Sequence, residues 1–216
     1  DLAVARGDDI LFGGTFDPLH IGHLIIAQEI LDQRLVDRVL FVSAGEPWLK
    51  SDRSVSPAEH RLAMTKLAIQ GNPDFEIDDI EVCRSGPTYT VDTLEQLATG
   101  LAGGADLYLV LGADTMADLD RWKTPHRLFD LATVIVVNRA TAPTVDGSSL
   151  GRSGDTAADR VISVDAPAIG ISGTEIRNRV AKSRSIRYLV PTAVEDYIYE
   201  HRLYRTHERS LSGSTS

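Results

Sequence analysis

The segment Gly13–His23, GGTFDPLHIGH, gathers residue types that can bind an anion. It follows the short apolar run Ile10–Phe12. A strand ending at Gly13 and Gly14, followed by a turn and a helix starting near Gly22, would direct free backbone N–H groups and the positive end of the helix dipole at one ligand. The segment therefore predicts a phosphate site, although it has neither the Gly-Lys-Ser/Thr of a P-loop nor the G-x-G-x-x-G dinucleotide spacing.

Two histidines in this segment, His20 and His23, are three residues apart. If both lie on the first helical turn, they share a face and can hold one ligand between them. Histidine readily becomes cationic beside a phosphate, and even the neutral ring donates one N–H bond. Two other interpretations stay open: a zinc site with Asp17 as third ligand from across Pro18, and histidines that only cap or pack.

A second segment with polar residues suited to phosphate is Ile171–Arg177, ISGTEIR. Its S-x-x-E pattern predicts a capping box, so Ser172 and Thr174 would lie at a helix start where N–H groups and hydroxyls meet a phosphate. Arg177 follows one turn on and offers a bidentate fork. The alternative is an ordinary capped helix with a surface arginine.

Five short runs are rich in apolar and β-branched residues, which predicts strands. They are apolar throughout, as in a parallel sheet covered by helices on both faces. We therefore expect a doubly wound, Rossmann-like α/β fold with a single domain over residues 1–205 and a disordered tail over 206–216. The predicted strands are Ile10–Phe12, Arg38–Val42, Leu107–Leu111, Val134–Val137 and Val161–Val164.

Two more capping boxes predict helix starts, at Ser56–Glu59 and Thr192–Glu195. In the first, Pro57 would occupy the first helical position of a helix that runs to about Gln70. The second precedes an apolar stripe formed by Val194, Tyr197, Ile198 and His201. Residues 141–159 have no apolar period, which indicates a mobile loop.

Composition limits the possible functions. The 216-residue chain has a formal net charge of −9, which argues against non-specific binding to nucleic acid or an anionic membrane. Its longest apolar run, Leu131–Val137, is far shorter than the roughly 20 residues of a membrane span, and the amino terminus lacks a secretory pattern. A single cysteine, Cys83, is compatible with a reducing compartment such as the cytoplasm. We expect it to act as a small apolar side chain that fills space in the core.

Residues Gly14–His23 resemble the amino-terminal signature of the nucleotidylyltransferase superfamily, whose H-x-G-H element corresponds to His20–His23. The superfamily's second element, I-S-x-T-x-I-R, corresponds to Ile171–Arg177. The resemblance extends to Tyr204 and is closest to the nicotinate-nucleotide adenylyltransferases. It implies transfer of an adenylyl group from ATP to nicotinate mononucleotide in NAD biosynthesis, with release of pyrophosphate.

The resemblance also implies residue roles on the ATP side. His20 and His23 would contact the α- to γ-phosphates and act as catalytic residues together with Arg177 and Lys50, although a lone lysine is usually a solvated charge. Asp114 would contact the ribose, or alternatively cap the next helix. The full set of ATP-binding candidates is Gly13, Gly14, Thr15, Phe16, His20, His23, Gly112, Asp114, Arg139, Ile171, Ser172, Thr174 and Arg177.

The resemblance further implies that Trp122, Thr90 and Lys50 bind nicotinate mononucleotide, which suits a pyridine ring that needs an aromatic face and a carboxylate that needs donors. The alternatives are a core tryptophan and a helix-cap threonine. The family's Arg-Pro-Gly turn is replaced here by Arg139-Ala-Thr, so the role of Arg139 stays open. The role of Trp48 is open as well. Magnesium is expected on the ATP phosphates without a dedicated protein site, and a homodimer is compatible with the resemblance.

Other functions remain possible at this stage. A relative acting on nicotinamide mononucleotide or phosphopantetheine would share the phosphate elements, and a non-catalytic nucleotide-binding regulator would share the fold. The pair formed by Trp122 and Thr90 argues against phosphopantetheine. Retention of the phosphate-binding side chains argues against a regulator.

Overall fold

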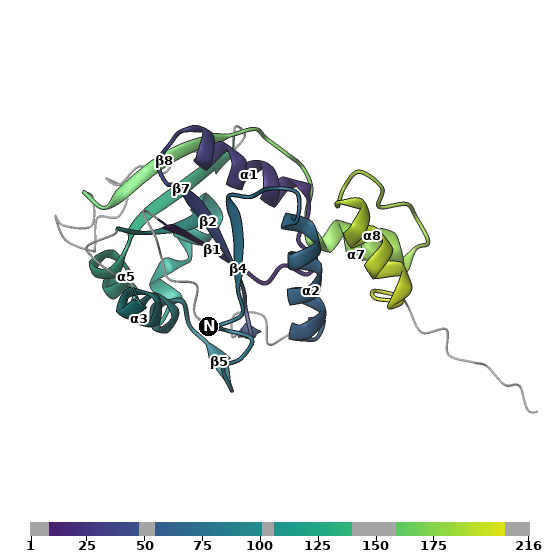
Figure 1. Ribbon diagram of the computed structural model, residues 1–216, viewed down its shortest axis with the longest axis horizontal. Helices are drawn as coiled ribbons and strands as arrows, with labels where there is room; N and C mark the ends of the chain where they lie inside the picture. The colour runs from purple at the N-terminus through teal and green to yellow at the C-terminus, as the bar shows by residue number, and fades with distance from the viewer. Residues whose placement is uncertain (1–8, 48–54, 101–105, 140–158, 206–216) are drawn as a thin grey trace, which may run out of the picture.

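Six parallel strands form the central sheet of the structure, a computed structural model that describes residues 9–47, 55–100, 106–139 and 159–205 (Figure 1). Along the sheet the strand order is β4-β2-β1-β6-β7-β8. The chain therefore winds outward from β1 in one direction and then from β6 in the other, as in a doubly wound fold. The strands are β1 (Asp9–Gly14), β2 (Arg38–Ser43), β4 (Phe75–Asp78), β6 (Leu107–Gly112), β7 (Thr133–Arg139) and β8 (Val161–Ala166).

Alternate residues of the central strands fill two hydrophobic cores, one on each face of the sheet. In β1, Ile10 and Phe12 belong to one core and Leu11 to the other; in β7, Ile135 and Val134 are divided in the same way. Because both faces are covered, the strands are apolar at nearly every position. The five predicted strands and the α/β class are confirmed.

Helices cover both faces of the sheet. On the first face, α1 (Ile21–Asp32) and α2 (Ala58–Ile69) pack with α7 (Gly173–Ala181) and α8 (Thr192–Glu200), and Figure 1 shows α8 beyond α2. The second face carries α3 (Thr90–Gly100), α4 (Ala113–Ala117), the 3₁₀ turn η2 (Leu119–Arg121) and α5 (Pro125–Leu131). A short parallel pair, β3 (Glu46–Pro47) with β5 (Pro87–Thr88), lies apart from the main sheet.

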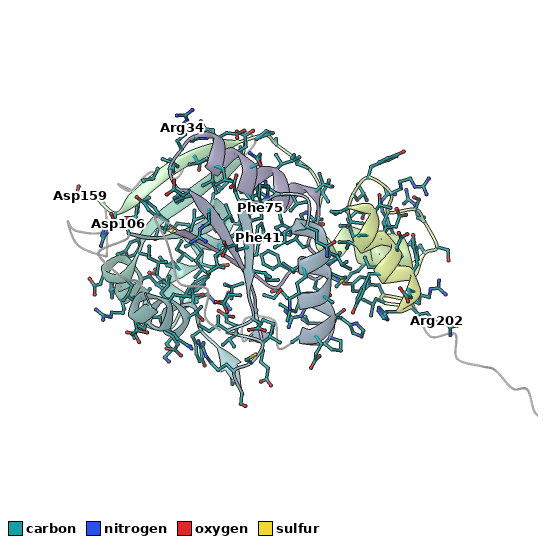
Figure 2. The ribbon with its side chains drawn as sticks, in the orientation of Figure 1. Arg34, Phe41, Phe75, Asp106, Asp159 and Arg202 are labelled. Atoms are coloured by element: carbon teal, nitrogen blue, oxygen red, sulfur yellow. The ribbon has the colours of Figure 1, made fainter. Side chains whose placement is uncertain are left out.

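Aromatic side chains fill the first core near the middle of the sheet. The ring of Phe41 lies 5.3 Å from that of Phe12 and 5.2 Å from that of Phe75, and Figure 2 shows Phe41 and Phe75 in the interior. Phe16, from the loop after β1, joins the same group with its ring 6.0 Å from Phe41. The core therefore extends under the loop that carries the anion-binding segment.

Of the three predicted capping boxes, only the one at Ser172 has its first residue at the helix cap with a side-chain bond, and the Glu175 carboxylate pairs with Arg179 instead of closing the box. Ser172 caps α7, and its hydroxyl accepts from the backbone N–H of Glu175 at 3.2 Å. At the other two sites a proline with extended ψ is the cap residue: Pro57 precedes α2 and is not its first helical residue, and Pro191 precedes α8, so that Thr192 lies inside the helix. Neither of these caps makes a side-chain hydrogen bond.

Cys83 was expected to be a small apolar filler, and this prediction is wrong because the side chain is exposed. It lies in an irregular segment between β4 and β5, away from either core. The predicted mobile loop lies outside the described residues except for Asp159, and the predicted tail from residue 206 lies outside them entirely. No helix in the described part of the chain is long and apolar enough to cross a membrane.

Candidate functional site

Two adjacent cavities open at the carboxyl ends of β1 and β6, where the winding of the sheet reverses and ligands bind in such folds. The H-x-G-H cavity, of about 330 Å³, is lined by residues of the β1–α1 loop, the start of α1, and the segment from β8 to α7. The Trp122 cavity, of about 350 Å³, is lined by β6, Thr90, Trp122 and residues after β2. Both cavities are lined by Gly14, Thr15, Phe16, His23 and Ile26.

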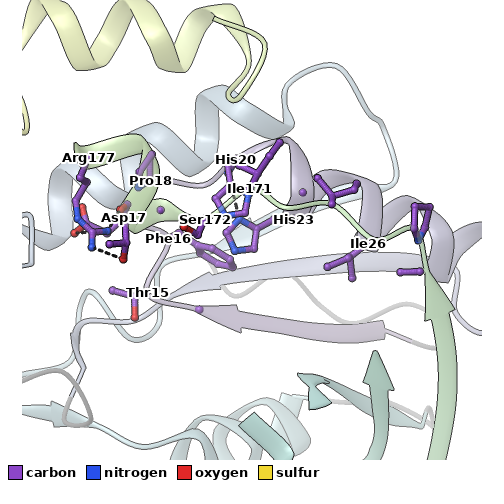
Figure 3. A pocket seen from close by; sticks show the side chains of 17 residues that line it. Thr15, Phe16, Asp17, Pro18, His20, His23, Ile26, Ile171, Ser172 and Arg177 are labelled. Carbon is purple, nitrogen blue, oxygen red and sulfur yellow. Dashed lines mark hydrogen bonds and ion pairs between the residues drawn. The ribbon is translucent and has the colours of Figure 1, made fainter. Parts of the chain in front are cut away.

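The two histidines cap helix α1. His20 is the cap residue and lies outside the helix, so the expectation that both histidines lie on the first turn is corrected. The backbone N–H of His20 donates to Nδ1 of His23 at 3.2 Å, the contact that a glutamate makes in an ordinary capping box. The two rings stack with centroids 3.8 Å apart (Figure 3). The three-residue spacing therefore brings both imidazoles to the cavity wall.

The surroundings of the histidines fix their orientation. A Cβ on Gly22 would lie 3.1 Å from Nδ1 of His20, so glycine leaves room for that ring. The ring of Phe16 meets that of His23 edge-on at 5.2 Å, and its backbone has φ of 47°, a left-handed conformation uncommon for a bulky residue. Such conformations persist where the surrounding structure holds them in place, often at functional sites.

Asp17 connects the β1–α1 loop to distant parts of the chain. Its buried carboxylate accepts from the Tyr204 hydroxyl at 2.8 Å and the Ser56 backbone N–H at 3.4 Å, and lies 3.8 Å from Nη1 of Arg177. Nη1 of Arg177 also donates to the Asp17 carbonyl, while Nη2 donates to the Thr174 hydroxyl at 3.1 Å. Figure 3 shows Asp17 beside Arg177, across the cavity from His20 and His23. The two sequence motifs are thus joined directly.

The zinc alternative gains no support from this arrangement, because Asp17 faces Arg177 and Tyr204. Across the described ranges, no three His, Cys, Asp or Glu side chains come together in a way that could hold a metal ion. Ser172 and Thr174, by contrast, line the H-x-G-H cavity at the start of α7, with Arg177 one turn on. The residues present are therefore suited to an anion.

The Trp122 cavity brings together Thr90, Trp122 and Gly112. Helix α3 begins at Thr90, so the positive end of its dipole lies at this cavity. Nε1 of Trp122 is buried and has no hydrogen-bond partner within the described residues. A buried donor without a partner is uncommon in folded proteins and marks a place where a ligand acceptor would fit.

Some predicted site residues lie elsewhere or outside the description. Asp114 is exposed on the first turn of α4 and lines neither cavity, and the cap residue of that helix is Gly112, so Asp114 does not cap it. Arg139 ends β7 at the same edge of the sheet. Lys50 and Trp48 lie outside the described residues. Of the remaining candidates, Gly13 lines only the Trp122 cavity and Ile171 only the H-x-G-H cavity.

Sequence reasoning missed two buried charged residues at the site. Arg61, only 1% exposed, donates to four backbone carbonyls: those of Ser56 and Thr15 at 2.9 Å, Gly45 at 2.7 Å, and Ala44. Burial lowers the pKa of its guanidinium, and the nearby Asp17 carboxylate opposes that shift. A signal existed, since Arg61 lies on the same helical stripe as the buried residues Met64, Thr65 and Ala68.

The second missed residue is Glu81, which lines the Trp122 cavity and is 8% exposed. Its carboxylate accepts from the Thr93 hydroxyl at 2.8 Å. Burial raises the pKa of this carboxyl, and the Thr93 and Thr88 side chains, the Arg84 charge and the Gly45 backbone partly offset the shift. Glu81 stands in an irregular segment without periodicity, so no sequence pattern pointed to it.

Comparisons with known proteins agree with this geometry. The chain matches the family described as cytidylyltransferase-like over residues 11–179. It is 46% identical to a Roseiflexus sp. protein over 90% of this chain and 96% of the relative, and 45% identical to a Thermomicrobium roseum protein over 95% of each. Both are named "Probable nicotinate-nucleotide adenylyltransferase".

Solved structures show the same fold. A Plasmodium falciparum nicotinic acid mononucleotide adenylyltransferase complexed with NaAD is similar with a TM-score of 0.76 and 22% identity, over 92% of this chain and 98% of that one. A Vibrio parahaemolyticus protein described as a putative nicotinate-nucleotide adenylyltransferase is similar with a TM-score of 0.62 and 17% identity, over 93% and 96% of the two chains.

The contact between Tyr204 and Asp17 predicts a pH-dependent stability. We expect Tyr204→Phe to lower the free energy of unfolding by about 1.5–3 kcal/mol at neutral pH, the usual contribution of a hydrogen bond to a charged group. Burial, followed by the Asp17 charge, raises the pKa of the Tyr204 phenol. Its contribution is therefore complete below the unfolded pKa of about 10 and is lost as the pH rises further.

Denaturant unfolding at several pH values, with Tyr188→Phe as control, measures this effect. Tyr188 is 84% exposed, so its hydroxyl should contribute little to stability. The gap between the wild type and Tyr204→Phe should narrow above pH about 10. Equal stability of the two variants at neutral pH would contradict the contribution assigned to the Tyr204 hydroxyl.

Proposed function

Because this chain belongs to the nicotinate-nucleotide adenylyltransferases of the cytidylyltransferase-like family, it transfers the adenylyl group of ATP to nicotinate mononucleotide, and we propose that its two adjacent cavities divide the substrates between them. The products are nicotinate adenine dinucleotide and pyrophosphate. In this proposal the H-x-G-H cavity holds the ATP phosphates and the Trp122 cavity holds the nicotinate ring. One observation carries the proposal: His23 lines both cavities.

The reaction needs charge stabilisation more than it needs a base. A phosphate monoester has a second pKa near 6, so at neutral pH the nucleophile is already mostly ionised. Its oxygen attacks the α-phosphorus of ATP, and the bond from that phosphorus to the bridging oxygen of the leaving pyrophosphate breaks. The barrier lies in aligning two polyanions and in stabilising the charge that develops during transfer.

The histidines are placed to supply that stabilisation. Because Nδ1 of His23 accepts the His20 backbone N–H, the proton of a neutral His23 ring lies on Nε2. Nε2 can then donate to a phosphate oxygen at the junction of the cavities. His20, stacked on His23 at 3.8 Å, contributes a second donor on the same wall.

The other phosphate ligands come from helix α7 and its cap. Ser172 and Thr174 offer hydroxyls and the helix start offers backbone N–H groups, while Arg177 is held in place by Asp17 and Thr174. Lys50 remains a proposed ligand of the transferring phosphates. On the nucleoside side, Gly112 and Asp114 remain proposed contacts of the ATP ribose, with Arg139 nearby at the same sheet edge.

The Trp122 cavity suits a nicotinate ring. The indole offers a face for stacking and the Nε1 donor described above, and the start of α3 at Thr90 favours a negative substituent. A carboxylate would gain from that positive helix end, whereas an amide would not. This electrostatic difference supports the acid as the preferred acceptor.

Magnesium would accompany ATP. When bound, it neutralises charge on the triphosphate and orients it. Gly14, Thr15 and the α7 start would then bind the phosphates around the ion, without a cage of protein carboxylates. We place the reaction in the cytoplasm, which a lone, unpaired cysteine suits.

An acceptor comparison tests the function. Purified protein is mixed with ATP and magnesium, and pyrophosphate release is measured separately with nicotinate mononucleotide, nicotinamide mononucleotide and phosphopantetheine. We expect nicotinate mononucleotide to give the highest kcat/KM. A tenfold preference for the amide, about 1.4 kcal/mol, would reverse the substrate assignment, and no release with any acceptor would reject the enzyme assignment.

A histidine substitution tests the mechanism. We expect His23→Ala to lower kcat by about 10² to 10³, the loss typical of one transition-state donor, while the protein stays folded and loses about 0.5–2 kcal/mol of stability with the helix-cap bond. His126→Ala is the matched control, because His126 is exposed on α5 and lines neither cavity. Near-normal turnover by His23→Ala would remove the donor role.

A further inference from the structure

The ionised side chain of Glu81 is energetically unfavourable in its buried position. It is a carboxylate 8% exposed at the wall of the Trp122 cavity, and burial penalises its charged form. No ion pair to Glu81 forms in the described part of the chain, although the Arg84 guanidinium, which donates to Thr93 at 3.2 Å, favours its charged form. The hydrogen bond to its carboxylate comes from the Thr93 hydroxyl at 2.8 Å, and the nearby Thr88 side chain and Gly45 backbone also favour the charged form.

The Gly45 peptide group lies between two buried charges. Its backbone N–H helps to lower the pKa of the Glu81 carboxyl, and its carbonyl accepts from Arg61 at 2.7 Å. A Cβ at position 45 would overlap the Glu81 carbonyl oxygen, so glycine is required for this approach. The two charged residues thus hold opposite sides of one short segment.

That segment forms part of the Trp122 cavity wall. Ala44 and Pro47 line the cavity, and Pro47 pairs with Thr88 in the β3–β5 ladder. None of Ala44, Pro47, Thr88 and Glu81 lines the H-x-G-H cavity. Anything that moves this wall should change the Trp122 cavity and leave the neighbouring one largely as it is.

We propose that Glu81 is a positioning residue for the acceptor substrate: through the hydrogen bond from Thr93 and its close contact with the Gly45 peptide group, it holds residues 44–47 where nicotinate mononucleotide binds. The inference depends on the division of substrates proposed above. A carboxylate offers two acceptor oxygens to these groups, whereas the amide of a Glu81→Gln variant offers one and would turn an NH₂ group toward a donor. Glu81 therefore acts on the acceptor KM without taking part in the chemical step.

Substitutions of Thr93 test the same contact without changing Glu81 itself. It is fully buried, donates to Oε1 of Glu81 at 2.8 Å, and lines neither cavity. Thr93→Val keeps the shape and removes the hydroxyl, whereas Thr93→Ser keeps the hydroxyl and removes a methyl group. If Thr93 acted only by packing, Thr93→Ser would be the more damaging change, because it removes the methyl group. In the proposed role, Thr93→Val raises the KM for the acceptor more than Thr93→Ser, because it removes the hydroxyl.

The experiment measures pyrophosphate release, varying each substrate in turn, for the wild type, Glu81→Gln, Thr93→Val, Thr93→Ser and the control Glu76→Gln. Glu76 forms a half-exposed ion pair with Arg38 and lines neither cavity. We expect the KM for nicotinate mononucleotide to rise about tenfold in Glu81→Gln and about three- to tenfold in Thr93→Val, the scale of a lost buried hydrogen bond. Thr93→Ser and Glu76→Gln should stay within about twofold, as should kcat and the KM for ATP in every variant.

An unchanged acceptor KM in Thr93→Val and Glu81→Gln would overturn the proposal, and so would a parallel rise in both KM values. If Glu81→Gln does not fold, the comparison of Thr93→Val with Thr93→Ser decides alone. Failure of the proposed function gives a different result, because the wild type would then release no pyrophosphate with nicotinate mononucleotide.

Discussion

The position of the loop between β1 and α1 depends on two guanidinium groups that each hold one of its backbone carbonyls. Arg61 donates to the carbonyl of Thr15, and Arg177 donates to that of Asp17. A buried carbonyl in a turn has no strand or helix partner, and leaving it without a donor is costly. Arginine supplies several donors in a rigid fork, so one side chain can hold several turns at once. The placement of His20 and His23 follows from this support.

The same contacts also provide positive charge for binding anionic substrates. The chain carries a net charge of −9, yet its site must receive a triphosphate and a second phosphate. The two arginines and the ends of α1 and α7 bring positive potential to the β1–α1 loop, and the buried Asp17 carboxylate offsets part of it. Removing either Asp17 or Arg177 would leave the other, largely buried charge uncompensated, which is costly. The two side chains therefore stabilise each other's positions. The loop between β1 and α1 is thereby held in place before substrate binds, which reduces the entropy lost on binding.

The sequence predicted what periodicity and motif spacing can express. Central strands such as Val134–Val137 are apolar on both faces, so they stood out, whereas β4 (Phe75–Asp78) was missed because it is a half-buried edge strand with two acidic residues. The boxes at Ser56 and Thr192 were misread because each adjoins a proline whose fixed φ suits the extended cap position. Ser56 instead uses its backbone to contact Asp17 and Arg61. Arg61 donates to backbone carbonyls, which every residue has, so no pattern of side-chain types recorded its targets. Glu81 lies in an irregular segment without periodicity, so its burial left no pattern either.

The local structure also bears on how His23 acts. A general base needs an unprotonated nitrogen directed at the proton to be removed, and Nδ1 of His23 instead accepts the backbone N–H of its own helix cap. A neutral ring fixed in this way carries its proton on Nε2 and can only donate from that atom. The ring also packs edge-on against Phe16, which belongs to the aromatic core. The capping contact and the proposed donor role therefore require the same tautomer, and the fold favours it before a phosphate arrives.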